Sequence, residues 1–378
     1  MANSSKKRTN NINKILICIL TVLLFFTILS GAAFFYMQDY VMAEVKQQDQ
    51  QVQKTNQELI EQYNQRLAEA PKVTTQEKPT TWPAASQTGF DILDLSEFEL
   101  KSTRSVPVTR DELISGGLML VNRWHPLPYD FNEEALLSIG RTHSDIPVNN
   151  YSLRLLPTAL DALKAMLDGA KEAGYEHYLI EEGYRTNEQQ TSYFETEEKR
   201  WNDKYVGQAL IEKVRVSVNV PGTSEYQTGL SFRIKRWQSG EVEFNDVPFQ
   251  ESEHCKWLLD NGHKYGYTFR FPVNGYPLPT TTNQAWKTGE SKKLRIFRYV
   301  GEGPATMMKL LDISLEEFIE YMIEHPHIAL YEDGVLKYEF IRVQDNSTPI
   351  QNVDVVSNAV ETQISTDNMG GIIISMSY

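Results

Sequence analysis

The sequence has little cysteine and no excess of positive charge. Its 378 residues include two cysteines, Cys18 and Cys255, too few for a disulfide framework or for a multi-cysteine zinc or iron–sulfur site. Acidic residues outnumber Lys and Arg by 50 to 37, for a formal net charge of −13. We therefore expect no nucleic-acid partner, because such binding needs a basic face. The 41% hydrophobic content predicts one large domain or two, stabilised by packing.

Charge is also absent from residues 15–36, an apolar run that is long enough to cross a bilayer core as a helix. Residues 1–14 carry four Lys or Arg and no acidic residue, which places them in the cytoplasm by the positive-inside rule. We therefore expect a single-pass cell-membrane protein with an extracellular C-terminal part. The alternative is a cleaved signal peptide, because residues 30–33 are small, although signal-peptide apolar regions are usually shorter.

Two further segments precede the globular part. Residues 37–70 are rich in Gln, Glu, Lys and Asn and contain no Gly or Pro, which predicts a helical stalk. Val45, Val52 and Leu59 keep a seven-residue spacing but fill only one heptad position, so a stalk-mediated dimer is a weak alternative to a single helix. Residues 71–110 begin with a Pro-, Thr- and Ser-rich run and are expected to form a linker.

The globular part mixes helical patterns with short β-branched or aromatic runs. This mixture predicts an α+β domain at 111–327. Residues 328–378 contain two hairpin patterns, one of them around Asp333-Gly334, and predict a small C-terminal β appendage. Helices are expected where apolar residues recur at helical spacing, at 157–174, 188–203, 251–265 and after the capping-box pattern of Ser314 and Glu317.

Five segments, in this order, resemble the VanY-type D-alanyl-D-alanine carboxypeptidases, zinc peptidases that trim the stem peptides of bacterial cell walls. Five ordered segments are a more specific signal than one shared motif. The resemblance implies a peptidase fold with an antiparallel central sheet and flanking helices. The segments are LMLVNRWHPLP (118–128), EGYRTNEQQ (182–190), VPGTSEYQTGL (220–230), NGHKYGYTFRFP (261–272) and FRYVGEGPATMM (297–308).

The resemblance also implies a tetrahedral zinc with three protein ligands and one position for water. The family takes two ligands from the pattern S-x-H-x-x-G-x-A-x-D, and the third ligand and the base from E-x-x-H. Ser224 and Gly229 match the first pattern. The ligand and base positions do not match: the three ligand positions hold Tyr226, Arg233 and Ile296, and the base position holds Lys293.

These replacements lack the donor atoms that zinc needs. A neutral tyrosine such as Tyr226 is a poor ligand, because its pKa is about 10. Arg233 has no lone pair to give and Ile296 has no donor atom. Lys293 cannot act as a carboxylate base while it is charged, and two cations would repel a metal. We therefore predict that the zinc cofactor and the carboxypeptidase activity are lost.

None of the seven histidines falls at a position that the family uses for zinc. His254 and His263 are nine residues apart on a predicted helix and would point to opposite faces. A displaced metal site is a minor alternative, and surface or structural roles are the simpler interpretation. The other five histidines are His125, His143, His177, His325 and His327.

The resemblance implies that part of the substrate site is retained. Arg185, Gln190 and Ser224 match family positions that help to hold the substrate peptide. The guanidinium of Arg185 suits a peptide carboxylate, and the alternative for this residue is an ordinary structural ion pair. Arg233 and Lys293 would then hold a carboxylate in place of the zinc.

The leading hypothesis is a membrane-anchored, metal-free pseudoenzyme that binds cell-wall stem peptide or a cell-wall or membrane protein. Two alternatives stay open. One is an active cell-wall hydrolase with a non-standard metal site, which stoichiometric zinc in the purified protein would indicate. The other is a structural or assembly module whose pocket is filled by bulky residues such as Phe232 and Trp286.

Overall fold

The computed structural model describes residues 89–378. The expected cytoplasmic tail, membrane span, stalk and stalk-mediated dimer, and most of the linker, lie outside the described residues. The predicted localisation as a single-pass membrane protein is corrected here: within 89–378, no helix is long and apolar enough to cross a bilayer. The longest helix of this part, α4 (Pro157–Glu172), has 16 residues, about 24 Å of helix against a bilayer core of about 30 Å.

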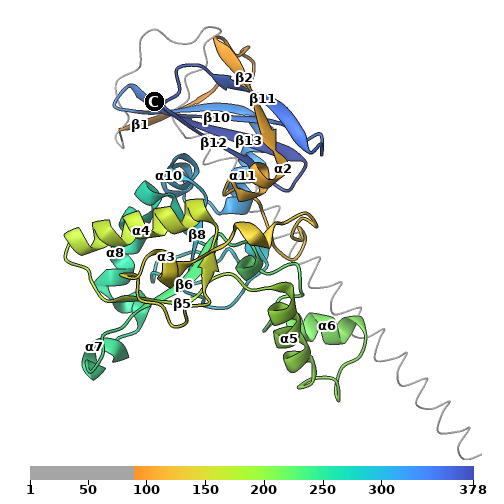
Figure 1. The fold of residues 1–378 in the computed structure, drawn as a ribbon, viewed down its shortest axis with the longest axis vertical. Coiled ribbons are helices and arrows are strands. Elements are labelled where there is room, and N and C mark those ends of the chain that lie inside the picture. The colour runs from red at the N-terminus through yellow and green to blue at the C-terminus, as the bar shows by residue number, and fades with distance from the viewer. Residues whose placement is uncertain (1–88) are drawn as a thin grey trace, which may run out of the picture.

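A four-stranded sheet with the order β5-β6-β8-β7 forms the centre of the larger lobe (Figure 1), and its strand pairs are all antiparallel. One face of this sheet packs with α4 and α8 into a common apolar core. The predicted antiparallel sheet with flanking helices is therefore confirmed. The elements are β5 (Tyr178–Glu182), β6 (Ser231–Arg236), β7 (Tyr267–Phe269), β8 (Ile296–Tyr299) and α8 (Glu253–Asn261).

Helix α4 shows how the local sequence produces this packing. Pro157 occupies the first turn, where its missing N–H costs nothing. Leu160, Leu163 and Met166 lie on one stripe and are fully buried in the core under the sheet. Gly174, with φ of +87°, takes the left-handed conformation that commonly follows a helix end. The helix predicted at 157–174 is confirmed, with its last turn shortened.

A second, five-stranded antiparallel sheet has the order β1-β9-β10-β13-β12 and forms the upper lobe of Figure 1. Strands β1 and β2 fall in the segment predicted as a linker, and both pair with C-terminal strands. The C-terminal strands are therefore part of a shared β layer rather than a separate appendage, because backbone pairing joins them to the N-terminal strands. The strands are β1 (Phe90–Asp94), β2 (Thr103–Thr109), β9 (His327–Glu332), β10 (Val335–Gln344), β11 (Ile350–Val356), β12 (Glu361–Thr366) and β13 (Gly371–Ser377).

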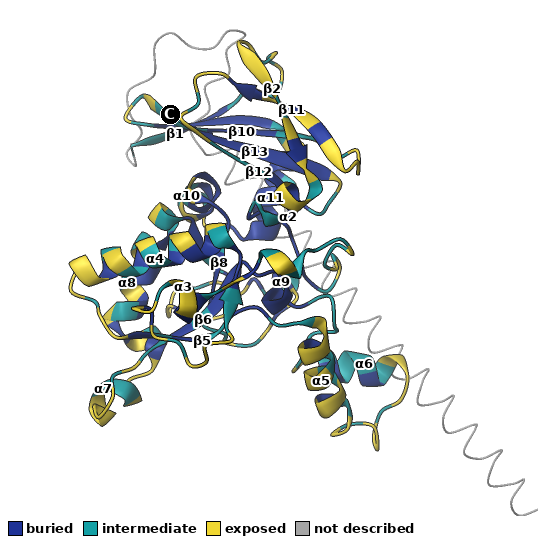
Figure 2. Ribbon diagram, viewed as in Figure 1, coloured by how far each residue is buried: buried dark blue, intermediate teal, exposed yellow. Residues whose placement is uncertain are grey.

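Side chains alternate between the two faces of this sheet, and both faces are buried (Figure 2). Phe340 and Ile373 face helices α10 (Glu302–Leu311) and α11 (Leu315–Glu324), which lie between the two lobes. Their neighbours Ile341 and Ile372 face the opposite way and pack with the β2–β11 pair. Helix α11 is thus fixed by the upper sheet, and it carries a residue that reaches the site described below.

Two local predictions in this lobe are confirmed. Asp333 and Gly334 both have positive φ, +50° and +77°, as a type I′ turn requires, and they join β9 to β10. Ser314 accepts a hydrogen bond from the backbone N–H of Glu317, and the Glu317 carboxylate accepts one from the Ser314 backbone N–H, which completes the capping box of α11.

The two other predicted helices are shorter than expected. The 188–203 segment contains α5 (Asn187–Glu198), which starts at a capping box and projects from the body together with α6 (Gln208–Arg215) (Figure 1). The 251–265 segment is α8 followed by a 3-10 turn, η4 (Gly262–Tyr265). The remaining elements are α2 (Arg110–Ser115), η1 (Glu133–Ala135), β3 (Leu137–Ser138), α3 (Ile139–Thr142), β4 (Arg154–Leu155), η2 (Glu225–Gln227), α7 (Val242–Asp246), η3 (Phe249–Glu251) and α9 (Ala285–Thr288).

Candidate binding site

The three positions where the family would place zinc ligands meet at one cavity. Arg233 of β6 lies directly opposite Ile296 of β8 in the antiparallel register, so both side chains stand on the same face of the sheet. Tyr226, from the turn η2, packs against Ile296. All three line a cavity of about 360 Å³ that also contains Arg185. The spatial convergence of the motif is therefore retained although the residue types have changed.

The residues at this point do not fit a zinc ion. Ile296 is fully buried and offers no donor atom. Burial raises the pKa of Tyr226 to about 12, even though the cations of Arg233 and Arg185 act to lower it, so the phenol stays protonated at neutral pH. Arg233 brings a positive charge. Elsewhere in the described part of the chain, no group of three or more His, Cys, Asp or Glu side chains is arranged to hold a metal ion.

Lys293 does not take the place predicted for it. Its side chain is exposed and is absent from the cavity lining, and its ammonium lies 5.8 Å from the centre of the Tyr276 ring. The reason is that Lys293 precedes β8, in a segment where its neighbour Lys292 is the residue that lines the cavity. Lys292 is already engaged with the Ser217 carbonyl at 2.5 Å. Arg233 is therefore the cation that lines the cavity at a position where the family would place a zinc ligand.

The predicted substrate residues Arg185, Gln190 and Ser224 all line the same cavity. The Arg185 guanidinium already donates two hydrogen bonds of 3.0 Å to Glu182 and one of 3.2 Å to Gln190. It also lies 3.9 Å above the Tyr226 ring. Arg185 thus forms the structural ion pair that was the alternative for this residue. A ligand would contact the N–H groups of Arg185 that remain unbonded.

Positive charge exceeds negative charge around these residues. Four cations surround two carboxylates: Arg295 lies 2.7 Å from Glu181, and Lys235 and Arg233 lie 3.3 and 3.4 Å from it. Glu182 lies 3.0 Å from Arg185 and 3.5 Å from Arg233. We call this group the basic cluster; its members are Arg185, Arg233, Lys235, Arg295, Glu181 and Glu182. Its excess of two positive charges sits in an acidic chain and would attract an anionic group.

Two buried polar atoms at the cavity have incomplete hydrogen bonding. The Tyr226 hydroxyl and the Arg233 Nε are buried and have no neighbour in good hydrogen-bond geometry within 89–378, although Arg233 Nε lies 3.4 Å from the Glu181 carboxylate and Tyr226 lies beside the Arg233 side chain. A buried donor without a partner costs about 1–3 kcal/mol, so such atoms mark places where a ligand or water completes the bonding. Both belong to residues that line the cavity, and both would complement a carboxylate.

Phe232 and Trp286 do not fill the cavity. Phe232 follows the pleat to the other face of the sheet, where it stacks on Phe297 and contacts Tyr267. Trp286 is absent from the cavity lining. The cavity is therefore open, whereas the filled-pocket alternative predicts that these two side chains occupy it.

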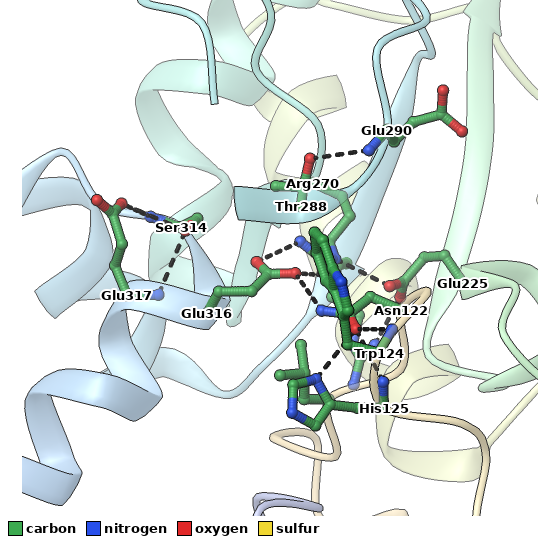
Figure 3. A network of polar contacts seen from close by, with 12 residues as sticks. Asn122, Trp124, His125, Glu225, Arg270, Thr288, Glu290, Ser314, Glu316 and Glu317 are labelled. Carbon is green, nitrogen blue, oxygen red and sulfur yellow. Dashed lines mark hydrogen bonds and ion pairs between the residues drawn. The ribbon is translucent and has the colours of Figure 1, made fainter. Parts of the chain in front are cut away.

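A buried ionic network supports the cavity floor (Figure 3). Arg270 donates to Glu225 at 2.8 Å and makes a bidentate contact of 2.7 and 2.9 Å with Glu316 of α11. Arg298 donates to Glu225 at 2.5 Å and to the carbonyls of Gly117 and Met119. All four charged side chains are at most 5% exposed. Because Glu225 adjoins Tyr226 in η2, this network fixes the turn that carries the site.

The sequence interpretation missed this network. The available signal was a charged residue inside an apolar strand, as with Arg298 in Phe297-Arg298-Tyr299 and Arg270 between Phe269 and Phe271. A charged residue at such a position must be paired when it is buried. The partners Glu225 and Glu316 are too distant in sequence to be identified without the fold.

The network predicts an acid-dependent loss of stability. Burial alone would raise the pKa of Glu225, but Arg298 and Arg270 hold it at about 2, against about 4.3 in an unfolded chain. The stabilisation is therefore complete above about pH 4.5 and is lost as the pH falls toward 2, by roughly 3 kcal/mol in full. Urea unfolding at pH 6, 5, 4 and 3 should show the stability of the wild type approaching that of Glu225→Gln. A constant difference between the two proteins would contradict this.

The histidines have structural partners or aromatic neighbours, and within 89–378 they do not gather around a common point as metal ligands would. His325 bonds with Asp94 at 2.6 Å and His327 with Glu339 at 2.7 Å. His254 of α8 is placed among aromatic rings, including those of Tyr175 and Tyr178.

Comparisons with known proteins agree with this architecture. The family model VanY, described as D-alanyl-D-alanine carboxypeptidase, matches residues 152–287. YodJ of Bacillus subtilis (strain 168), named as a carboxypeptidase, is 31% identical over 203 residues, which cover 54% of this chain and 67% of that protein. A D-alanyl-D-alanine carboxypeptidase of Enterococcus faecium is 23% identical over 284 residues, covering 73% of this chain and 80% of that protein.

One solved structure supports the fold. It is the vancomycin-resistance D,D-dipeptidase VanXYg in complex with a D-Ala-D-Ala phosphinate analogue, with a TM-score of 0.55, 21% identity, and coverage of 73% of this chain and 99% of that chain. At this identity the likeness shows the fold alone. With the sequence relatives and the converging motif positions, it leads to one conclusion: this chain belongs to the VanY family of D-alanyl-D-alanine carboxypeptidases.

Proposed function

We propose that this chain is a metal-free member of the VanY family that binds the carboxylate end of a cell-wall stem peptide without hydrolysing it. The observation that carries the proposal is the cavity of about 360 Å³ at the family's metal position, where the three ligand positions hold Arg233, Tyr226 and Ile296. A cavity with a cation and a neutral phenol can hold an anion. The three ligand positions offer no carboxylate or imidazole for zinc, and within 89–378 the carboxylates elsewhere in the lining, Glu197, Glu225 and Glu290, are not grouped to hold a metal ion.

In this proposal Arg233 is the residue that contacts the ligand carboxylate. Its guanidinium is only loosely paired, at 3.4 Å from Glu181 and 3.5 Å from Glu182, and its Nε has no hydrogen bond. The Arg233 side chain is about one-third exposed, and a charge-assisted hydrogen bond from its guanidinium is stronger than a neutral one. The Tyr226 hydroxyl would donate a second bond. Arg185, held by Glu182, would keep Tyr226 in place through its stacking contact.

The peptide class follows from family membership, because the enterococcal relative is named for D-alanyl-D-alanine ends. The chain keeps the family positions Arg185, Gln190 and Ser224, and all three lie at the cavity. An active hydrolase with another metal site is not favoured by any residue cluster in 89–378. A cell-wall or membrane protein as partner has no separate support from the cavity.

The test is peptide binding by the full chain, measured by isothermal titration with a stem peptide that ends in D-Ala-D-Ala. Arg233→Ala is expected to weaken binding by at least about tenfold, because a hydrogen bond to a charged group contributes about 1.5–3 kcal/mol. Arg185→Ala is also expected to weaken it. Arg104→Ala, an exposed residue of β2 in the upper lobe, is the matched control and should bind like the wild type.

Two results would overturn the proposal. Failure of the wild type to bind the peptide would remove the binding function. Release of D-Ala during the titration, together with stoichiometric zinc in the purified chain, would show an active hydrolase instead.

A further inference from the structure

A second hollow adjoins the cavity. It has a volume of about 570 Å³, within the range of about 300–1,000 Å³ typical of small-molecule sites. Tyr193 and Arg233 line both spaces, so the two are neighbours with a shared wall. The hollow lies between the 149–154 loop, the end of β5 and the first turns of α5. We call it the outer hollow.

Aromatic surface lines the outer hollow without being covered. Tyr151 is 62% exposed and Tyr193 is 50% exposed. The ring of Tyr151 rests against Gly140, where an added Cβ would come within 2.9 Å of its Cδ1 atom. Tyr193 has Arg185 at 4.8 Å from its ring centre. A single exposed tyrosine is ordinary, but two at one polar hollow form a stacking surface with a polar tip on each ring.

The outer hollow also offers free hydrogen-bonding groups. Among the described residues, the guanidinium of Arg141 and the side-chain amide of Asn149 have no partner, and both line the hollow. The Gln189 side-chain oxygen accepts from Thr186, which leaves its amide N–H groups available. Glu181 and Glu182 also line the hollow; they are ion-paired with the cations of the basic cluster, and a carboxylate can accept further hydrogen bonds beside an ion pair. Donors and acceptors are therefore both present, which suits a ligand rich in hydroxyl groups.

An extended peptide is less well accommodated here. Peptides commonly add to a free sheet edge through backbone hydrogen bonds, and β5 is an edge strand of the four-stranded sheet. That edge is already occupied, because Asn149 N–H donates to the Ile180 carbonyl at 2.8 Å and Ile180 N–H donates to the Pro147 carbonyl at 2.9 Å. A phosphate-rich ligand would meet the carboxylates of Glu181 and Glu182.

We propose that the outer hollow binds a saccharide of one or two pyranose rings. The apolar C–H face of a pyranose stacks on Tyr151, and its hydroxyl groups bond with Arg141, Asn149 and the carboxylates that line the hollow. This site adjoins the proposed carboxylate site, with Tyr193 and Arg233 in the shared wall, but saccharide binding does not require a bound peptide. A ligand that carries both a saccharide and a peptide would span the two spaces.

The experiment is a titration of the full chain with N,N′-diacetylchitobiose and with cellobiose, followed by chemical-shift perturbation or calorimetry. We expect at least one disaccharide to bind, with a dissociation constant of about 1 mM. Tyr151→Ala is expected to weaken this binding at least about fivefold. Tyr129→Ala is the matched control, since Tyr129 is fully exposed and does not line the hollow, and it should leave saccharide binding unchanged.

A second variant tests the geometry without removing the ring. In Gly140→Ala the added Cβ would displace the Tyr151 ring from its present position. We expect this variant, like Tyr151→Ala, to bind the disaccharide more weakly than the wild type. Tyr226→Phe removes a hydroxyl of the proposed carboxylate site at a residue that does not line the outer hollow; it should leave disaccharide binding within about twofold, which separates this site from the proposed peptide site. Absence of disaccharide binding by the wild type would overturn the proposal. So would a Tyr151→Ala variant that loses the stem peptide but keeps the disaccharide, because the hollow would then hold peptide.

Discussion

Replacement of Glu225 with alanine is expected to lower the free energy of unfolding by about 3–5 kcal/mol. Glu225 is the shared partner of Arg270 and Arg298, at 2.8 and 2.5 Å. Both guanidinium groups are at most 1% exposed, so removal of the carboxylate leaves buried positive charge with too little compensation. The free energy of unfolding from urea titration at pH 7 measures the effect. Peptide binding should fall as well, because the turn η2 positions Tyr226.

The control for this prediction is Glu241→Ala. Glu241 is exposed and its side chain has no partner among the described residues, so we expect a change within about 0.5 kcal/mol. Glu316→Gln tests the far end of the network and should also be destabilising, since it removes a charge that Arg270 contacts at 2.7 Å. A Glu225→Ala protein as stable as the Glu241→Ala control would show that the network does not hold the cavity floor.

Restoring the family ligands is expected to create a zinc site. The triple variant Tyr226→His, Arg233→Asp and Ile296→His would place two imidazoles and one carboxylate at positions that already line one cavity. This is a donor set that zinc accepts. We expect about one zinc per chain after dialysis against micromolar zinc, compared with none in the wild type. Elemental analysis by mass spectrometry measures the content.

The matched control keeps the arginine, as the double variant Tyr226→His and Ile296→His. A positive guanidinium at the site repels the metal, so this variant should retain far less zinc than the triple variant. Stoichiometric zinc in the wild type would contradict the proposed loss of the metal. Lack of zinc in a folded triple variant would mean that the three positions do not converge as closely as the register of β6 and β8 indicates.

The helices and the hairpins were largely predictable because their signals are local. Pro157 and Gly174 bound α4, the Ser314–Glu317 pair begins α11, and Asp333-Gly334 turns between β9 and β10. Each of these features depends on residues within a few positions of one another. Strands β1 and β2 were missed because a pairing between residues more than 200 positions apart leaves no local pattern.

Some features of the candidate site could likewise be predicted from the sequence, and others required the fold. The identity of the residues at the metal positions could be read from the motif, and so could their lack of donor atoms. The exposure of Lys293, the prior pairing of Arg185 with Glu182, and the open space beside Arg233 could not. These depend on which side chains the sheet register places on one face.

The sequence by itself determined the family resemblance and the loss of the metal donors, because residue type alone decides whether an atom can ligate zinc. Only the tertiary structure decided that Tyr226, Arg233 and Ile296 still meet around a cavity. It also decided that Glu225 and Glu316 compensate two buried arginines. Burial and charge pairing result from contacts between distant segments, and these exist only once the strands have paired and α11 has packed between the two sheets.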